Sequence, residues 1–308
     1  MVVVGIAGGT GGLGRAIVDV LKAQGKHTIK VLSRKATSEL EQKLGVSIAT
    51  VDYTDATSLA RTLEQNDIHT VISTLATAEA EPQLNLIRAA DMSAVTKRFA
   101  PSEFGILYTA RHAKMFPIAS NKLLAVEELK KTSLEYTLFS NGFFLDYFGM
   151  PSVKSYLQPL TIVVDLANNV AAIPGDGNTP VVFTHTFDVA NFVAASLDLE
   201  NWPERSIIIG DKVTWNKFVE TAEAVKGTKF DVTYDSVETL KTGKVTELPS
   251  HVPVYPFFPK EQLQGLLSIF GLWFEDGTFN LDAEKSLNKI FPEIQTKKVE
   301  DILKEVYT

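Results

Sequence analysis

Short apolar runs rich in β-branched residues alternate with stretches of helical periodicity through the first half of the chain. The runs predict strands over residues 2–7, 28–33, 47–53, 69–74 and 96–102, with a sixth over 136–141. Each gap between consecutive runs holds one helix-length pattern. Strands that alternate with helices through short connections are typical of a parallel sheet covered on both faces. The pattern therefore predicts an α/β fold with a doubly wound parallel sheet of Rossmann type.

The second half of the chain is less regular. Its pattern predicts, in order, an apolar run over 161–167, a turn over 174–180, a helix over 187–199, a strand over 206–210 and a helix from Thr214. No internal repeat and no low-complexity linker separates the two halves. We therefore expect one domain over 1–150 and a smaller, interleaved α/β domain over 151–308, some of whose elements return to the first sheet.

Composition narrows the classes of function. The 308 residues include 45% hydrophobic side chains, enough for a sizeable core, and the net charge is −7 without any long basic run, which argues against nucleic acid as a partner. Cysteine is absent and the five histidines are scattered, so we expect no disulfide and no metal site. The longest apolar stretch, 266–274, is about half a membrane span. We expect a cytoplasmic protein with a small-molecule partner and no membrane contact.

Gly8, Gly11 and Gly14 follow the first strand in a G-x-x-G-x-x-G spacing and open the first helix. Glycine at these points permits a tight turn, a close approach of backbone N–H groups to a pyrophosphate, and close packing of the helix on the sheet. In this context the loop predicts a dinucleotide site within 1–150, the alternative being a glycine-rich turn without ligand. The predicted contacts are Gly8, Thr10, Gly11, Gly12, Leu13 and Gly14.

The end of the second strand predicts which cofactor this loop holds. An NAD site has an acidic residue there, whereas this chain has Ser33, Arg34 and Lys35. Because a guanidinium favours a 2′-phosphate, we predict NADP(H) over NAD(H), the alternative being that Arg34 and Lys35 lie in a solvated loop. Asp52, after the third strand, either faces the adenine amine or caps a helix.

Further cofactor contacts are predicted at the carboxyl ends of the later strands, where open α/β sheets bind their ligands. These contacts are Thr74 and Leu75 after the fourth strand, Ser102 and Phe104 after the fifth, and Asn141 and Phe143 after the sixth. Phe143 belongs to an aromatic cluster for which core packing is the alternative. Glu103 either anchors its loop through backbone amides or contacts the ligand.

The reactive group expected on this fold is missing. Short-chain dehydrogenases generally use Tyr-x-x-x-Lys, but none of the eight tyrosines has a lysine four residues further on. Lys122 remains, and the pattern of 115–131 places it in the first turn of a helix, where a cation opposes the helix dipole. It precedes the sixth strand, at the edge of the sheet where ligands bind. We predict that Lys122 is catalytic, the alternative being a solvated surface lysine.

Several segments together resemble the isoflavone reductase-like branch of the NmrA-like atypical short-chain dehydrogenases/reductases. They are PSEFG (101–105), the helix with Lys122, LEYTLFSNGFFLDYF (134–148), GDGNTPVVFTHTFDVANFVA (175–194) and IFPEIQTKKVEDIL (290–303). The resemblance runs from end to end of the chain. It implies NADPH-dependent reduction of phenylpropanoid-derived substrates in secondary metabolism, with Lys122 at the position of the family's catalytic lysine.

By this resemblance, Lys122 holds the nicotinamide ribose and takes part in proton transfer at the substrate oxygen. A lysine in an apolar pocket either titrates nearer neutrality or stays charged and stabilises an oxyanion. Two departures from the plant reductases concern the substrate pocket: the segment between Gly105 and Lys122 is shorter, and a basic residue expected after the lysine is Ala125. We therefore expect a different pocket, and plant substrates are not carried over by name.

Candidate substrate contacts are aromatic residues and one histidine, for all of which a packing role is the alternative. They are Phe104, Phe144, Tyr147, His185, Tyr255, Phe258 and Trp273. Residues 248–277 are rich in proline and aromatic side chains, and apolar residues at 263, 266, 267, 270 and 274 follow a helical period, so one face should pack. We interpret this segment as a lid or wall over the ligand, with core or a dimer surface as alternatives.

The leading functional hypothesis is an NADPH-dependent reductase of a bulky aromatic, polyketide-like or phenylpropanoid-like small molecule, by hydride transfer from the nicotinamide. One alternative is an NmrA-like redox sensor that binds NADP(H) without turnover. Another is a redox-neutral isomerase or cyclase on the same fold. The presence of Lys122 favours an enzyme, and the protein is expected to be a monomer or a homodimer.

Overall fold

The computed structural model describes residues 1–308, and their contacts divide the chain into two compact units. Unit 1 comprises Met1–Ser140 and Val189–Ser206, and unit 2 comprises Asn141–Asp188 and Ile207–Thr308. The chain therefore passes from unit 1 to unit 2, back to unit 1, and again to unit 2. The expected roles of the two domains, cofactor binding over 1–150 and mainly substrate binding over 151–308, remain proposals.

A six-stranded parallel sheet of order β3-β2-β1-β4-β5-β6 forms the centre of unit 1. Its strands are β1 (Val3–Ala7), β2 (Thr28–Ser33), β3 (Ser47–Thr50), β4 (Ile68–Ser73), β5 (Arg98–Ala100) and β6 (Glu135–Tyr136). The chain winds outward from β1 to β3 and then, from β4, in the opposite direction. This order is that of a Rossmann fold, so the predicted fold class is confirmed.

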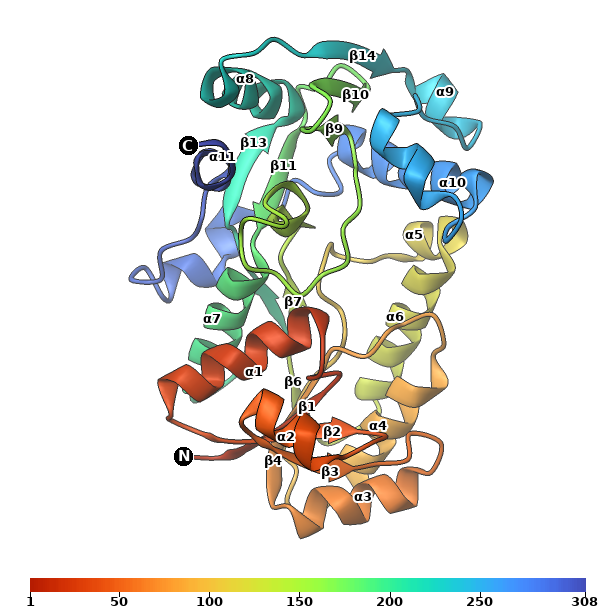
Figure 1. The fold of residues 1–308 in the computed structure, drawn as a ribbon. Helices are drawn as coiled ribbons and strands as arrows, with labels where there is room; N and C mark the ends of the chain where they lie inside the picture. The colour runs from red at the N-terminus through yellow and green to blue at the C-terminus, as the bar shows by residue number, and fades with distance from the viewer. The chain divides into compact units, whose positions relative to one another are not determined.

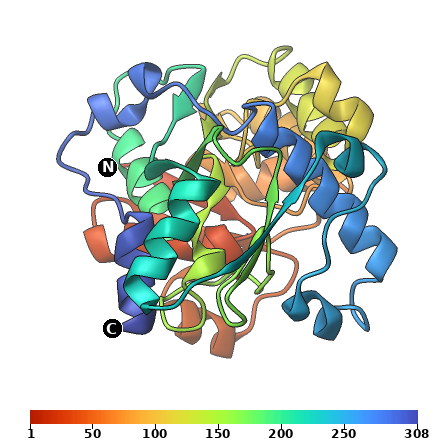
Figure 2. The same ribbon diagram turned by 90° about the horizontal axis from the view of Figure 1, so that it is seen from above.

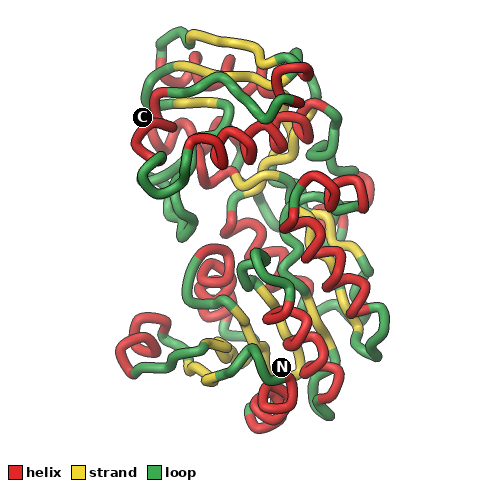
Figure 3. Tube along the Cα trace, turned by 90° about the vertical axis from the view of Figure 1, so that its right-hand side faces the viewer, coloured by secondary structure: helices red, strands yellow, loops and turns green.

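Helices cover both faces of this sheet (Figure 3). The helices that lie in or begin this part of the chain are α1 (Gly12–Gln24), α2 (Ser38–Leu44), α3 (Ala56–Gln65), α4 (Glu81–Met92), α5 (Ala110–Met115), α6 (Pro117–Leu129) and α7 (Thr186–Ser196), of which α5 packs on α6 and not on the sheet. On one face, Leu63 of α3, Ile87 of α4 and Leu129 of α6 share a buried core with Val71 and Phe99 of the sheet. Helix α1 packs against β1 and β2 on the other face (Figure 1). A sheet buried on both faces has the nearly continuous apolar strands seen in the sequence.

The sixth predicted strand, 136–141, is wrong as a single strand. The chain pairs with β5 only over β6 and then forms β7 (Leu138–Ser140), which pairs with β12 (Arg205–Ile207). Thr137 lies between the two strands, and its side chain shares a hydrogen bond of 2.7 Å with Ser206. The strand predicted over 206–210 is likewise shorter, because β12 ends at Ile207 and the Ile209 amide donates to the Asn288 side chain instead of a strand.

Small sheets and helices make up unit 2. Its strands are β8 (Phe143–Phe144), β9 (Val164–Asp165), β10 (Val170–Pro174), β11 (Pro180–Thr184), β13 (Asp211–Thr214) and β14 (Asp231–Asp235), in the orders β14-β10-β9 and β13-β11-β8. Its helices are α8 (Trp215–Lys226), α9 (Val237–Lys241), α10 (Lys260–Glu275) and α11 (Val299–Tyr307), with short 3-10 turns at Leu145–Phe148, Pro249–Val254, Ala283–Lys285 and Leu287–Lys289. Helices α8 and α11 lie side by side (Figure 2).

Helix α10 confirms the predicted helical face. Leu263, Leu267 and Phe274 are buried, and Leu266 and Phe270 are half-buried. The residues before α10 are more exposed, and Phe257 is 89% exposed. Thr214 caps α8 by accepting a hydrogen bond from the Lys217 amide, as a helix beginning near Thr214 requires.

Candidate active site

The glycine loop brings the ends of β1 and β4 together. Gly8 has φ +82°, and a Cβ at Gly8 or Gly14 would lie 2.6 Å or 2.3 Å from the Thr74 side-chain oxygen. Thr74 is fixed in this position by its own hydrogen bond of 2.8 Å to the Ala7 carbonyl. Only glycine fits at these two positions, whereas Gly11 faces open space. The loop is therefore tightly packed against Thr74 at Gly8 and Gly14 and open to a ligand at Gly11.

The start of helix α1 lies at that mouth. Gly11 is its N-cap residue, no side chain caps its first turn, and no acidic residue lies there. Uncapped backbone N–H groups at a helix start attract an anion, and the helix dipole adds to this effect. The predicted contacts Gly12, Leu13 and Gly14 belong to this turn, and Thr10 directly precedes its N-cap residue. Open space over Gly11 and unsatisfied donors beneath it fit the pyrophosphate of a dinucleotide.

Arg34 and Asp52 line one cavity of about 360 Å³ in unit 1. Leu75, which follows β4, is also part of its wall, so three predicted cofactor contacts meet here. Asp52 does not cap α3, because Asp55 does. Its carboxylate accepts two hydrogen bonds from Thr54, which hold the pKa of Asp52 below its usual value and keep it an acceptor. The half-buried Ser33 and the exposed Lys35 do not line this cavity.

Hydrogen bonds join the ends of β4 and β5. The Ser102 hydroxyl donates to the Leu75 carbonyl at 2.8 Å, and the buried Gln83 accepts from both Ser73 and the Ser102 amide. Phe104 is buried and stacks on Phe139 at a centroid distance of 5.7 Å. The strand-end residues predicted to contact cofactor in unit 1 therefore form one continuous, well-supported edge.

Lys122 lies in the second turn of its helix, so its predicted place in the first turn is wrong. Pro117 starts α6 earlier than the pattern suggested, because proline without an N–H suits the first helical position. The conflict with the helix dipole is correspondingly smaller. Lys122 is nevertheless 7% exposed, which excludes the alternative of a solvated surface charge.

The amine of Lys122 points to the loop after β5. Its Nζ donates to the carbonyls of Glu103 and Phe104 and lies 4.6 Å from the centroid of the Tyr108 ring. Burial lowers the pKa of Lys122 to about 8, and the attraction of the Glu103 carboxylate opposes part of this fall. Burial raises the pKa of Glu103, and the Lys122 ammonium and Arg205 oppose that rise. Such an amine both holds and releases a proton near neutral pH.

Sequence reasoning missed Tyr108 and left the role of Glu103 open. Glu103 is buried and Tyr108 is half-buried, and neither side chain makes a hydrogen bond to another protein group. No spacing pattern relates Tyr108 to Lys122, because helix α5 and the first turn of α6 lie between them in the chain. The segment PSEFG (101–105) was the signal in the sequence that pointed to Glu103. The Glu103 carboxylate accepts no hydrogen bond from a backbone amide, so the interpretation that it anchors its loop in this way is wrong.

The remaining predicted residues belong to unit 2 and form its aromatic core or its surface. Phe143 is buried and contacts Phe183, Phe270, Phe274 and Phe279 at centroid distances of 5.3 to 6.4 Å. Trp273 is 1% exposed, so the structure favours packing over substrate contact for it. The other four aromatic or amide positions differ in exposure: Asn141 is buried, and Phe144, Tyr255 and Phe258 are half-buried. Tyr255 donates to Glu247.

Tyr147 and His185 lie near buried polar groups of unit 2. Tyr147 lines a cavity of about 180 Å³, and burial raises its pKa to about 12. His185 is buried and stacks on Phe187, and its Nε2 lies 3.6 Å from the Asp146 carboxylate. Burial lowers the pKa of His185, so the imidazole is neutral near pH 7. These contacts support the structural interpretation of His185.

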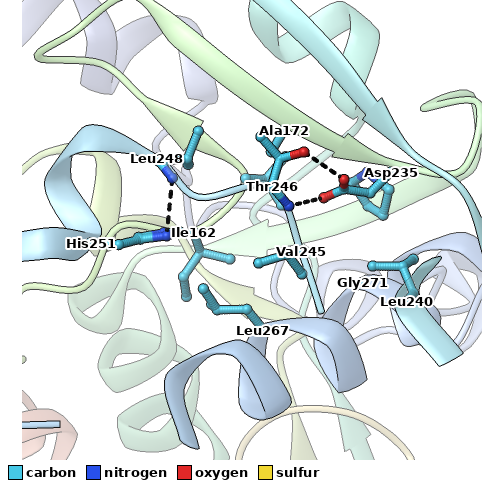
Figure 4. Close-up of a pocket in the computed structure, with 12 residues that line it drawn as sticks. Ile162, Ala172, Asp235, Leu240, Val245, Thr246, Leu248, His251, Leu267 and Gly271 are labelled. Atoms are coloured by element: carbon cyan, nitrogen blue, oxygen red, sulfur yellow. Dashed lines mark hydrogen bonds between the residues drawn. The ribbon is translucent and has the colours of Figure 1, made fainter. Parts of the chain in front are cut away.

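A second cavity in unit 2 lies between α10 and the segment before it (Figure 4). Its polar groups are already paired: Asp235 accepts from the Thr246 amide and hydroxyl, and His251 accepts from the Leu248 amide. Its volume of about 20 Å³ holds about one water molecule. This cavity is a packing defect beneath an anchored segment and offers no place for a substrate.

No helix of the chain combines the length and the apolar character needed to cross a bilayer.

Known proteins that are similar to this chain identify its family. A model of the NmrA-like family matches residues 2–303. Oxidoreductase BOA1 of Botryotinia fuckeliana is 42% identical over 300 residues, which cover 96% of each chain. Oxidoreductase swnN of Metarhizium robertsii is 32% identical over 343 aligned positions, covering 100% of this chain and 98% of the relative.

Solved structures share the fold at low identity. The complex of AtPrR2 with NADP+ and (+)pinoresinol superposes with a TM-score of 0.75 at 23% identity, covering 98% of each chain. The leucoanthocyanidin reductase–NADPH complex of Vitis vinifera gives a TM-score of 0.75 at 17% identity, again covering 98% of each chain. The comparisons confirm the resemblance and the expectation of an oxidoreductase, and the cofactor in these complexes is the expected one.

Proposed function

The chain belongs to the NmrA-like family, and from that membership and the buried amine of Lys122 we propose that it is an NADPH-dependent reductase of a bulky, oxygenated aromatic or polyketide-like small molecule. The observation that carries the proposal is a buried lysine whose amine donates to the carbonyls of Glu103 and Phe104, on the loop that follows β5 of a Rossmann sheet. A pure sensor has no use for an amine held at the cost of burial.

Residues of unit 1 hold the cofactor in this proposal. The first turn of α1 and the loop Gly8–Gly14 bind the pyrophosphate, for which Gly11 leaves open space. Arg34 binds the 2′-phosphate from the wall of the cavity that it shares with Asp52. NADPH, when bound, supplies the hydride. Thr74, Leu75, Ser102 and Phe104 support the remaining part of the cofactor at the strand ends.

Lys122 handles the proton. Below pH 8 its amine is mainly protonated, so at neutral pH it donates a proton to the substrate oxygen that becomes negative as the carbon is reduced. The carbonyls of Glu103 and Phe104 hold the amine in one position, which removes an entropic cost from this step. Substrate contacts from unit 2, including Phe144, Tyr147, Tyr255 and Phe258, remain part of the proposal.

The part of the proposal that concerns cofactor binding is tested by fluorescence titration with NADPH and with NADH. We expect NADPH to bind at least about tenfold more tightly. Arg34→Ser should weaken NADPH binding and leave NADH binding nearly unchanged. Lys35→Ser is the matched control, because Lys35 is its exposed neighbour and does not line the cavity. Equal affinity for both cofactors in the unaltered protein would contradict the assignment of Arg34.

The reductase half is tested by the consumption of NADPH with a panel of aromatic enones, quinones and cyclic ethers. We expect turnover with at least one of these classes, with one reduced product formed for each NADPH oxidised. Tight NADPH binding without turnover across the panel would favour the redox sensor. Conversion of a substrate without loss of NADPH would favour the isomerase or cyclase.

A further inference from the structure

Three groups surround the amine of Lys122. Two are the backbone carbonyls of Glu103 and Phe104, which accept hydrogen bonds from Nζ, and the third is the face of the Tyr108 ring at 4.6 Å. An ammonium group has three N–H donors, and an aromatic face attracts a cation through its quadrupole. The protein therefore offers a favourable position to the charged form of an amine that burial disfavours.

The position of Tyr108 depends on a glycine. Gly105 has φ +149°, and a Cβ added there would lie 2.9 Å from the Tyr108 hydroxyl. Tyr108 also packs edge to face against His112, with centroids 6.3 Å apart. The hydroxyl itself has no hydrogen-bond partner in the protein. Packing, and not a hydrogen bond, places the ring over the amine.

The charged and titratable groups around the amine come from two segments, the single loop between β5 and α5 and the segment that contains β12. Glu103, on the loop after β5, attracts the ammonium, and Arg205 attracts Glu103 from the segment that contains β12. Tyr108, on the loop before α5, contributes its neutral ring, because burial and Glu103 both raise the pKa of the phenol. Tyr108 is therefore a neutral ring, not an anion, over the whole range in which Lys122 titrates.

We propose that Tyr108 is a positioning residue whose ring face holds the Lys122 amine and sets the pH at which that amine loses its proton. The inference rests on the function proposed for Lys122, and it names the group that tunes it. The missing Tyr-x-x-x-Lys motif is thus replaced by a Tyr–Lys pair in which the ring acts on the lysine, where in that motif the lysine acts on the phenol.

An NMR titration of the Lys122 side chain tests this without measuring turnover. The full-length protein is labelled with 13C-lysine, and the Cε signal of Lys122 is assigned from its loss in Lys122→Met. In Tyr108→Leu the titration midpoint should fall by about 0.5 to 1 pH unit, because the ring no longer stabilises the ammonium. In Tyr108→Phe, which keeps the ring and removes only the hydroxyl, the midpoint should move by less than about 0.2 unit.

Other results overturn the proposal. An unchanged or higher midpoint in Tyr108→Leu would show that the ring only excludes water or does nothing. An equal fall in Tyr108→Phe would assign the effect to the hydroxyl. If Tyr108→Leu does not fold, fluorinated phenylalanines at position 108 replace it, and a midpoint that fails to fall as fluorine weakens the ring quadrupole overturns the proposal.

Failure of the proposed function looks different in the same experiment. If the midpoint shifts as expected but the pH dependence of turnover does not follow the protonation of Lys122, the positioning role of Tyr108 stands and the catalytic role of Lys122 is wrong. If turnover follows the midpoint of Lys122 in the unaltered protein but Tyr108→Leu changes neither, only the positioning role fails.

Discussion

Lys122 in unit 1 and Asp146 in unit 2 are both buried charged side chains, exposed by 7% and 0%. The Asp146 carboxylate accepts hydrogen bonds from the Thr186 amide, the Thr186 hydroxyl and the Ser155 hydroxyl at 2.8, 2.6 and 2.5 Å. Each of its oxygens is therefore paired with a short, local donor. Such a carboxylate links the 3-10 turn Leu145–Phe148 to the start of α7 and is a part of the framework.

The surroundings of Lys122 are different. Its amine contacts two carbonyls and a ring, while the side chains of its titratable neighbours Glu103 and Tyr108 make no hydrogen bond within the protein. The charge is compensated only in part, so the pKa of Lys122 falls to about 8. Burial alone therefore does not mark a functional charge. Incomplete pairing does, because it leaves the proton free to move.

Loss of Lys122 should have the largest effect. In Lys122→Met, which keeps the length and apolar character of the side chain, we expect kcat for NADPH-dependent reduction to fall by about 100- to 10,000-fold, because the proton donor is absent. Steady-state kinetics measure this. Lys130→Met, at the exposed end of the same helix, is the matched control. A loss within about twofold in Lys122→Met would refute the catalytic role.

Loss of Asp146 should act on stability. Asp146→Ala leaves the amide and hydroxyl of Thr186 without their acceptor, so the free energy of unfolding should fall by about 3 kcal/mol. Urea unfolding followed by circular dichroism measures it. Asp146→Asn retains one acceptor oxygen and should lose less. Equal stability of Asp146→Ala and the unaltered protein would remove the contrast with Lys122.

Replacement of Lys122 should raise the free energy of unfolding, whereas replacement of Asp146 should lower it. Lys122 has a pKa of about 8 in the folded protein against its ordinary 10.5, so the unfolded chain binds more protons between these values and the charged lysine disfavours folding below pH 8. We expect Lys122→Met to raise the free energy of unfolding at pH 7 by about 2 kcal/mol, part of the effect being offset because Glu103 loses its attraction. The difference should shrink as the pH rises from 8 towards 10.5. A destabilised Lys122→Met would show that the amine is a structural group.

Loss of the Glu103 charge should have the smallest effect. Glu103→Gln removes an attraction for the Lys122 ammonium, so the basic limb of the pH profile of kcat/KM should move down by about 0.5 pH unit. Glu127→Gln, on the exposed side of α6 and paired with Lys130, is the control and should leave the limb in place. An upward shift in Glu103→Gln would show that the carboxylate takes the proton from Lys122.

Much of the fold followed from the pattern of apolar residues. The strands β1, β2 and β4 were predicted to within about one residue, because they are buried on both faces and have no polar alternation. The short strands β6 and β7 were predicted as one, because a break at Thr137 depends on the distant Ser206. Helix α6 begins earlier than the apolar pattern predicts, because Pro117 takes the first helical position and this preference is not part of an apolar period.

The Rossmann sheet, the glycine loop and the choice of Lys122 as the candidate reactive group could all be predicted from the order of the residues. Each of these is encoded locally, by periodicity, by glycine spacing or by a segment that resembles a family. Only the tertiary structure decided that Lys122 is buried, that Asp52 and Arg34 share a cavity, and that Tyr108 covers the amine. The physical reason is that burial and a displaced pKa depend on groups from several segments, and no spacing along one segment records which groups will meet.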